Sequence, residues 1–128
     1  MANGPARAAF WMEFVTDRCD YPAPDRLRAQ LTNAEFSEFC GCGCNSFAVR
    51  VKPDVAPLAR SGGSHGAIFA ADFKLADDRT LEIILFANEE GNLDYIEVDC
   101  CANSCPVPDV IDVTPEPFRK WSGEGLLR

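Results

Sequence analysis

The most regular alternation of hydrophobic and polar positions in this chain lies between residues 67 and 99. Apolar side chains occupy every second position of residues 67–75 and of residues 81–87, and a third run covers 93–98. A period of two is typical of strands that bury one face. Turn-forming residues separate the runs at 77–79 and at 89–92. The pattern therefore predicts an antiparallel meander of strands across residues 67–99.

A second set of apolar residues falls on the otherwise polar positions of this meander. We expect Ile84, Phe86, Ile96 and Val98 to lie opposite the main alternating set, so that the central strand is apolar on both sides. Helices would cover one face of the sheet. The other face would be covered by the C-terminal tail, by a loop or by a second subunit.

The N-terminal part follows a helical period instead. Phe10 and Phe14 are four positions apart, as are Trp11 and Val15, which predicts a short helix over residues 6–15. A second short helix is expected from position 24 or 25 through residue 31, after two prolines. Residues 34–40 fit helix and strand, and we favour a strand that pairs with residues 47–51 as a hairpin.

Together these elements predict an α+β fold in one domain over residues 1–128. It would hold a single antiparallel sheet of about five strands, with one or two short N-terminal helices packed on one face. The length of 128 residues is ordinary for one domain. Residues 54–66, which contain Ser61-Gly62-Gly63-Ser64-His65-Gly66, predict a mobile loop. The proline-containing residues 106–128 predict an irregular tail, anchored on the sheet by Phe118 and Trp121.

The net charge of the chain limits the kinds of molecule that we expect it to bind. The formal net charge of −8 argues against nucleic acid, which requires a concentrated basic face, and fits a basic partner better. No stretch approaches the roughly 20 apolar residues that span a bilayer, and Glu13 interrupts the only short apolar patch near the N-terminus. We therefore expect no membrane partner and a cytoplasmic location. In that compartment the seven cysteines suit free thiols or a metal better than disulfides.

The candidate chemistry lies at Cys40-Gly41-Cys42-Gly43-Cys44, directly before the strand predicted at 47–51. In an extended strand, residues two apart are separated by about 6.6 Å. Two thiolates on one zinc ion lie only about 3.8 Å apart, as Zn–S bonds of about 2.3 Å require. Glycine can adopt a positive φ, so Gly41 and Gly43 could curl the backbone and bring the sulfurs together. A fourth ligand would come from water or from another donor, and the candidates are Cys19, Cys100, Cys101, Cys105 and His65.

Three uses of this turn are open. We favour an architectural role, in which the glycines form a tight turn and the cysteines serve as small buried side chains. The second is a zinc site, with Cys40, Cys42 and Cys44 as its ligands. The third is thiol redox chemistry, although the spacing is not that of a thioredoxin-type pair.

The order of several segments resembles small, uncharacterised bacterial proteins that carry a CGCG-type turn followed by a strand pair. The segments are Leu27-Arg28-Ala29-Gln30-Leu31, the turn at 40–47, Leu81-Glu82-Ile83-Ile84-Leu85-Phe86 and Gly91-Asn92-Leu93-Asp94-Tyr95-Ile96-Glu97-Val98. The resemblance covers residues 25–108 and is most specific at the cysteine–glycine turn. It implies a single domain and no assigned activity, and Cys100, Cys101 and Cys105 are not part of the pattern.

These observations favour a small acidic, non-catalytic binding module. Its exposed sheet face or loop would engage another protein, a basic one for instance, or a second copy in a homodimer. A zinc-stabilised domain and a thiol redox protein are the alternatives. The chain carries none of the hydrolase, metalloprotease or dinucleotide signatures, so we assign no catalytic or cofactor-binding residue. We interpret the acidic pairs Glu82 with Glu97 and Asp94 with Asp99 as outward-facing strand charges.

Overall fold

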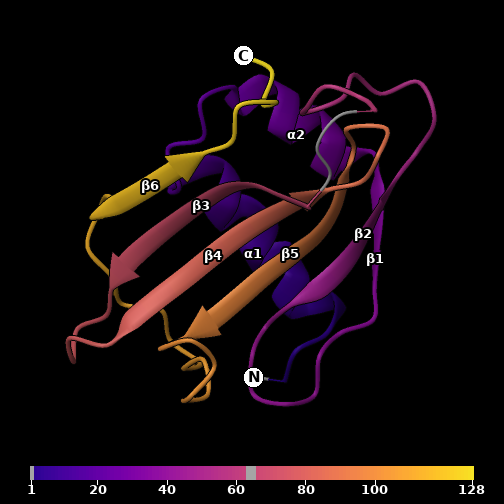
Figure 1. Cartoon of the computed structure of the whole chain (residues 1–128). Coiled ribbons are helices and arrows are strands. Elements are labelled where there is room, and N and C mark those ends of the chain that lie inside the picture. The colour runs from indigo at the N-terminus through magenta and orange to yellow at the C-terminus, as the bar shows by residue number, and fades with distance from the viewer. Residues whose placement is uncertain (1, 63–65) are drawn as a thin grey trace.

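The structure is a computed structural model of the chain, and it describes residues 2–62 and 66–128. Six strands form one antiparallel sheet in the order β1-β2-β5-β4-β3-β6 (Figure 1). The helices and strands have the following bounds: α1 Pro5–Asp17, α2 Pro24–Thr32, β1 Ala34–Ser37, β2 Phe47–Val51, β3 Gly66–Lys74, β4 Thr80–Ala87, β5 Leu93–Cys100 and β6 Arg119–Ser122. The predicted α+β class with N-terminal helices is confirmed, with one strand more than expected.

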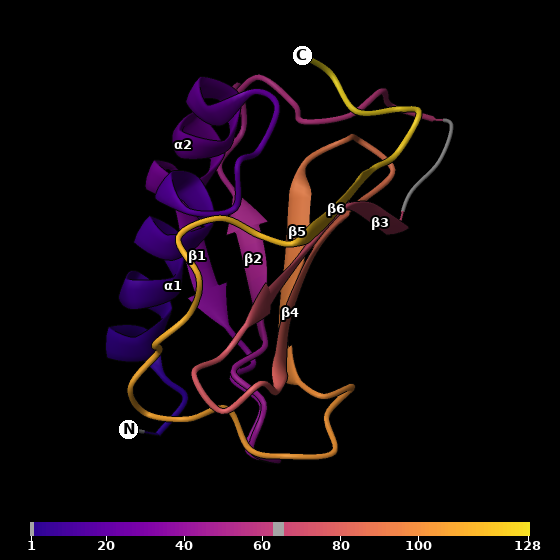
Figure 2. The ribbon, with the colours of Figure 1, turned by 90° about the vertical axis from the view of Figure 1, so that its left-hand side faces the viewer.

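Both helices pack on the same face of the sheet (Figure 2). Proline stands in the first turn of each, where a missing N–H removes no intrahelical bond. The apolar stripe of α1 points at the sheet, and the Phe14 and Phe73 rings meet edge-on with centroids 5.1 Å apart. Within the described residues, no helix is long and apolar enough to cross a membrane.

The hairpin of β1 and β2 forms as predicted, with Phe36 opposite Val49. The meander of β3, β4 and β5 also forms as predicted, and alternate residues of β4 are buried. One prediction about its faces is wrong. Ile96 and Val98 lie opposite Leu85 and Ile83 on the helix side and are fully buried.

The physical reason is a register shift between Phe86 and Ala87, where β4 meets the start of β5. Such a bulge changes which side chains of the next residues share a face. Ile84 and Phe86 do lie on the face away from the helices, which we call the outer face, and both are half-buried there.

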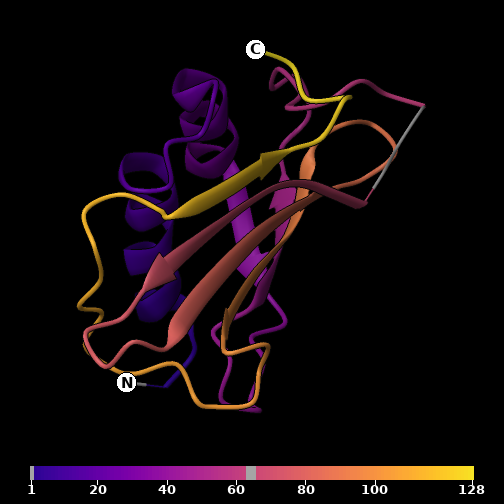
Figure 3. The ribbon, with the colours of Figure 1, turned by 60° about the vertical axis from the view of Figure 1, so that its left-hand side comes forward.

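The tail is not irregular throughout, which corrects the prediction for residues 106–128. Residues 119–122 form β6, which pairs with β3 and brings Trp121 opposite Ala70 (Figure 3). Neither predicted anchor is buried, since Phe118 is 49% and Trp121 51% exposed.

Before β6, the tail runs along α1 rather than over the outer face. Arg7 donates hydrogen bonds to the backbone oxygens of Pro108 and Asp109. Arg18 donates to the backbone oxygen of Thr114 in the same way. The expectation that the tail covers the second face of the sheet is therefore wrong.

The predicted loop at 54–66 ends one residue late, because Gly66 already belongs to β3. Residues 54–62 form no helix or strand, yet they are packed against the body of the domain. Leu58 and Ala59 are buried, and their backbone N–H groups donate to the oxygen of Gly91 at 2.8 and 3.1 Å. This packing was not predicted. His65 lies outside the described residues, as do residues 63 and 64 of the same predicted loop.

Candidate metal site at the cysteine turn

The cysteine turn connects β1 to β2 and is tied to the domain by backbone hydrogen bonds. Cys40 N donates to Ser46 O at 3.0 Å and so closes the turn. Asn45 N donates to Val98 O at 2.9 Å, and Val107 N donates to Gly43 O at 2.9 Å. Gly43 has a φ of +106°, which a residue with a side chain rarely adopts, whereas Gly41 keeps a negative φ. One of the two glycines thus supplies the bend.

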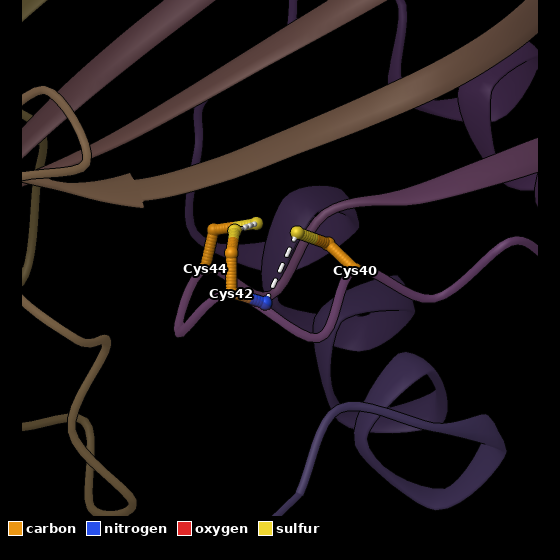
Figure 4. A group of neighbouring side chains, drawn as sticks. All are labelled: Cys40, Cys42 and Cys44. Atoms are coloured by element: carbon orange, nitrogen blue, oxygen red, sulfur yellow. Dashed lines mark hydrogen bonds between the residues drawn. The ribbon is translucent and has the colours of Figure 1, made fainter.

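This bend brings the three sulfur atoms together (Figure 4). The Sγ atoms of Cys40, Cys42 and Cys44 all lie within 4.8 Å of one another, and those of Cys42 and Cys44 are 3.3 Å apart. The backbone N–H of Cys42 also donates to Cys40 Sγ at 3.4 Å. These separations bracket the roughly 3.8 Å between two thiolates on one zinc ion.

The turn does not bury its cysteines as a group, which corrects the expectation of small buried side chains. Cys44 is buried, Cys40 is half-buried and Cys42 is exposed. An exposed thiol adds little to packing, so an architectural role does not account for Cys42.

Hydrogen bonding between the thiols shifts the pKa values of Cys40 and Cys42 in opposite directions. Hydrogen bonding with Cys40 lowers the pKa of Cys42 to about 7, and hydrogen bonding with Cys42 and Cys44 raises the pKa of Cys40 to about 12. The backbone N–H of Cys44 further favours the Cys42 thiolate. The lowered pKa favours the thiolate of Cys42, the form that acts as a metal ligand and a nucleophile.

The structure does not bring a fourth cysteine into this group. Cys19 is buried and desolvation raises its pKa, and Cys100 is also buried. Cys101 and Cys105 lie in the turn after β5, and no other His, Cys, Asp or Glu of the described residues joins the cluster. Asn103 of that turn donates from its Nδ2 to Cys42 Sγ at 3.9 Å.

A buried polar network behind the turn holds it in place. Asn45 Oδ1 accepts hydrogen bonds from Arg7 Nε at 2.8 Å and from Trp11 Nε1 at 3.0 Å. Sequence reasoning missed Asn45 and Arg7, because their role depends on α1 lying against the turn. A buried arginine on an apolar helix was the one available signal, since such a charge requires partners.

A second group of titratable residues lies on the outer face. Glu82 of β4 is opposite Asp99 of β5, and Glu97 lies two residues before Asp99 on β5. Carboxylate oxygens of all three lie within 4.8 Å of one another. Desolvation raises each pKa, and mutual repulsion raises those of Glu82 and Glu97 further. The predicted pair of Glu82 and Glu97 is thus brought together, whereas Asp94 is exposed and lies outside the group.

Comparisons of the chain with protein-family models, with curated proteins and with solved structures found no match.

Proposed function

We propose that this protein binds one zinc ion through the thiolates of Cys40, Cys42 and Cys44. The observation that carries the proposal is the convergence of three sulfur atoms within 4.8 Å on a bend made by Gly43. Thiolates are the ligands that thiophilic ions prefer, and zinc in particular takes cysteine in tetrahedral sites.

The proposed coordination has three protein ligands and one open position. Cys42 is exposed and Cys40 half-buried, so the fourth position faces solvent and takes water or a donor from outside the described residues. The lowered pKa of Cys42 favours its thiolate, and the metal displaces protons from the other thiols. A bound ion would cross-link the two ends of the turn, at Cys40 and Cys44, next to β2.

The same thiols favour one second candidate, a disulfide between Cys42 and Cys44, formed by exchange with an external disulfide that takes the two electrons and two protons and leaves as two thiols. Their sulfurs are 3.3 Å apart and Cys42 has the low pKa of a reactive thiol. Both uses require the Cys42 thiolate, but only the metal site requires Cys40 in the reduced protein.

The test is zinc binding by the reduced full chain, measured by competition with a zinc-binding chromophore. One ion per chain is expected for the wild type, and Cys40→Ser and Cys42→Ser are each expected to weaken binding by at least about 100-fold. Cys101→Ser is the matched control, because it removes a half-buried thiol outside the group.

Three results would contradict the proposal. They are binding of less than one zinc ion per chain by the wild type, a loss of zinc affinity in Cys101→Ser as large as that in Cys42→Ser, and binding of copper(I) without binding of zinc. Absence of zinc binding by the reduced wild type, together with loss of the free Cys42 and Cys44 thiols on treatment with an external disulfide, would favour the disulfide candidate instead.

A further inference from the structure

Over the described residues, the outer face of the sheet has no helix packed on it. Both helices pack on the other side, and the tail reaches β6 by running along α1, so neither covers the outer face (Figure 2). Sheets with one solvated face ordinarily present polar side chains there. This one presents a mixture of apolar and acidic residues.

The apolar part crosses four neighbouring strands. Trp121 of β6 is opposite Ala70 of β3, which is opposite Ile84 of β4. Two residues further along β4, Phe86 is opposite Tyr95 of β5, and their rings meet edge-on with centroids 6.0 Å apart. Trp121 is 51% exposed and Ile84, Phe86 and Tyr95 are half-buried, so the strip is accessible. An apolar strip of this kind on a soluble domain marks an interaction surface.

The acidic part adjoins this strip. Ile84 is directly opposite Glu97, and Glu82 and Asp99 complete the carboxylate group. Over residues 2–62 and 66–128, none of the three forms a salt bridge with lysine or arginine. Arg119 acts on the charge of Glu82 but forms its ion pair with Asp72, with Nη2 2.6 Å from its Oδ2. Three clustered carboxylates without an ion pair of their own favour a cation from outside the chain.

We propose that the outer face docks a basic, amphipathic segment of another protein, which places a lysine or arginine among Glu82, Glu97 and Asp99 and apolar side chains on Ile84, Phe86 and Tyr95. The carboxylates explain why the segment is basic, and the apolar strip explains why it is a protein rather than a lone cation. This proposal does not depend on zinc binding.

Charge also separates this occupant from a second copy of the chain. Two outer faces packed together would bring like carboxylate groups into contact, on subunits that each carry a formal net charge of −8. A basic segment reduces the same repulsion instead.

The probes are two display libraries of twelve-residue peptides. In one, lysine or arginine alternates with apolar residues, and in the other aspartate or glutamate takes the basic positions. The best binder of the first library is then synthesised, and its binding to the isotope-labelled full chain is followed by amide chemical shifts. We expect binders from the basic library only, with the largest shifts in β4 and β5, and affinity that falls as salt is added.

Matched variants locate the charge contact. Glu97→Gln is expected to weaken the selected peptide by about tenfold, and Ile84→Thr by a similar factor. Glu13→Gln makes the same charge change on the exposed side of α1 and is expected to alter affinity by less than about twofold. Circular dichroism of each variant checks that the fold is retained.

Several results would overturn the proposal. They are the absence of any basic binder tighter than about 100 μM, equal enrichment of the acidic library, shifts confined to the helix side, equal losses in Glu97→Gln and Glu13→Gln, or a stable dimer in light scattering that the peptide does not dissociate.

Discussion

Replacing Asn45 by alanine tests how the cysteine turn is held against α1. The amide oxygen of Asn45 is the acceptor for Arg7 Nε at 2.8 Å and Trp11 Nε1 at 3.0 Å. Arg7 is only 4% exposed and Trp11 is fully buried, so water cannot replace the lost acceptor without opening the core. Each buried donor left without a partner costs about 1–3 kcal/mol, so Asn45→Ala is expected to lower the free energy of unfolding by about 2–5 kcal/mol.

The assay is urea unfolding of the reduced chain, with two companion variants. Asn45→Asp keeps an acceptor opposite the Arg7 charge and is expected to stay within about 1 kcal/mol of the wild type. Asn33→Ala makes the same substitution where the side chain donates to Ala29 O at the end of α2, and a loss of about 1 kcal/mol is expected. A loss in Asn45→Ala no larger than that in Asn33→Ala would refute the reasoning.

Three further predictions concern the loop, the outer face and the thiols. Gly91→Ala would place its Cβ 1.9 Å from Ala59 O at a φ of +83°, so we expect a loss of about 3 kcal/mol or more in urea unfolding. Burial, and then the neighbouring carboxylates, raise the pKa of Glu97 in the folded state. The charge of Glu97 is therefore unfavourable at neutral pH and absent in acid, and Glu97→Gln removes it. We therefore expect a gain of about 0.5–1 kcal/mol at pH 7 that disappears near pH 3, and a gain of equal size at both pH values would contradict this. Zinc affinity should fall with decreasing pH, and the slope of its logarithm should steepen by about one between pH 8 and 6 as Cys42, with its pKa of about 7, protonates; an unchanged slope would argue against Cys42 as a ligand.

The elements with strong periodicity could be predicted from the sequence. Phe10, Trp11, Phe14 and Val15 give α1, and the alternation around Ile83 gives the meander, because burial on one face imposes the period. β6 could not be predicted in this way. It is a four-residue edge strand whose Arg119, Lys120 and Trp121 are all exposed, so it leaves no hydrophobic period in the sequence.

The pairing register of β4 and β5 was the second feature that could not be predicted from the sequence. Ile96 and Val98 were assigned to the wrong face because the register shifts between Phe86 and Ala87, and strand periodicity alone does not encode such a bulge. The same limit concealed the carboxylate group. Glu82 and Glu97 could be paired from the sequence, but the approach of Asp99 follows only from its position opposite Glu82.

At the cysteine turn, spacing identified the three candidate thiols but not their arrangement. Convergence of the sulfurs depends on a positive φ at Gly43, and the sequence allowed this geometry without requiring it. The exposure of Cys42 depends on neighbours from the chain after β5, including Val107, whose N–H holds Gly43 O. Those contacts join residues more than sixty positions apart, which local patterns do not encode.

X-ray absorption at the zinc edge of the reduced, zinc-loaded protein tests the central claim most directly. We expect three sulfur neighbours at about 2.3 Å and one lighter atom, with one sulfur lost in Cys42→Ser and none lost in Cys101→Ser. A shell of oxygen and nitrogen alone, or a shell that Cys42→Ser leaves unchanged, would contradict a zinc site built from Cys40, Cys42 and Cys44.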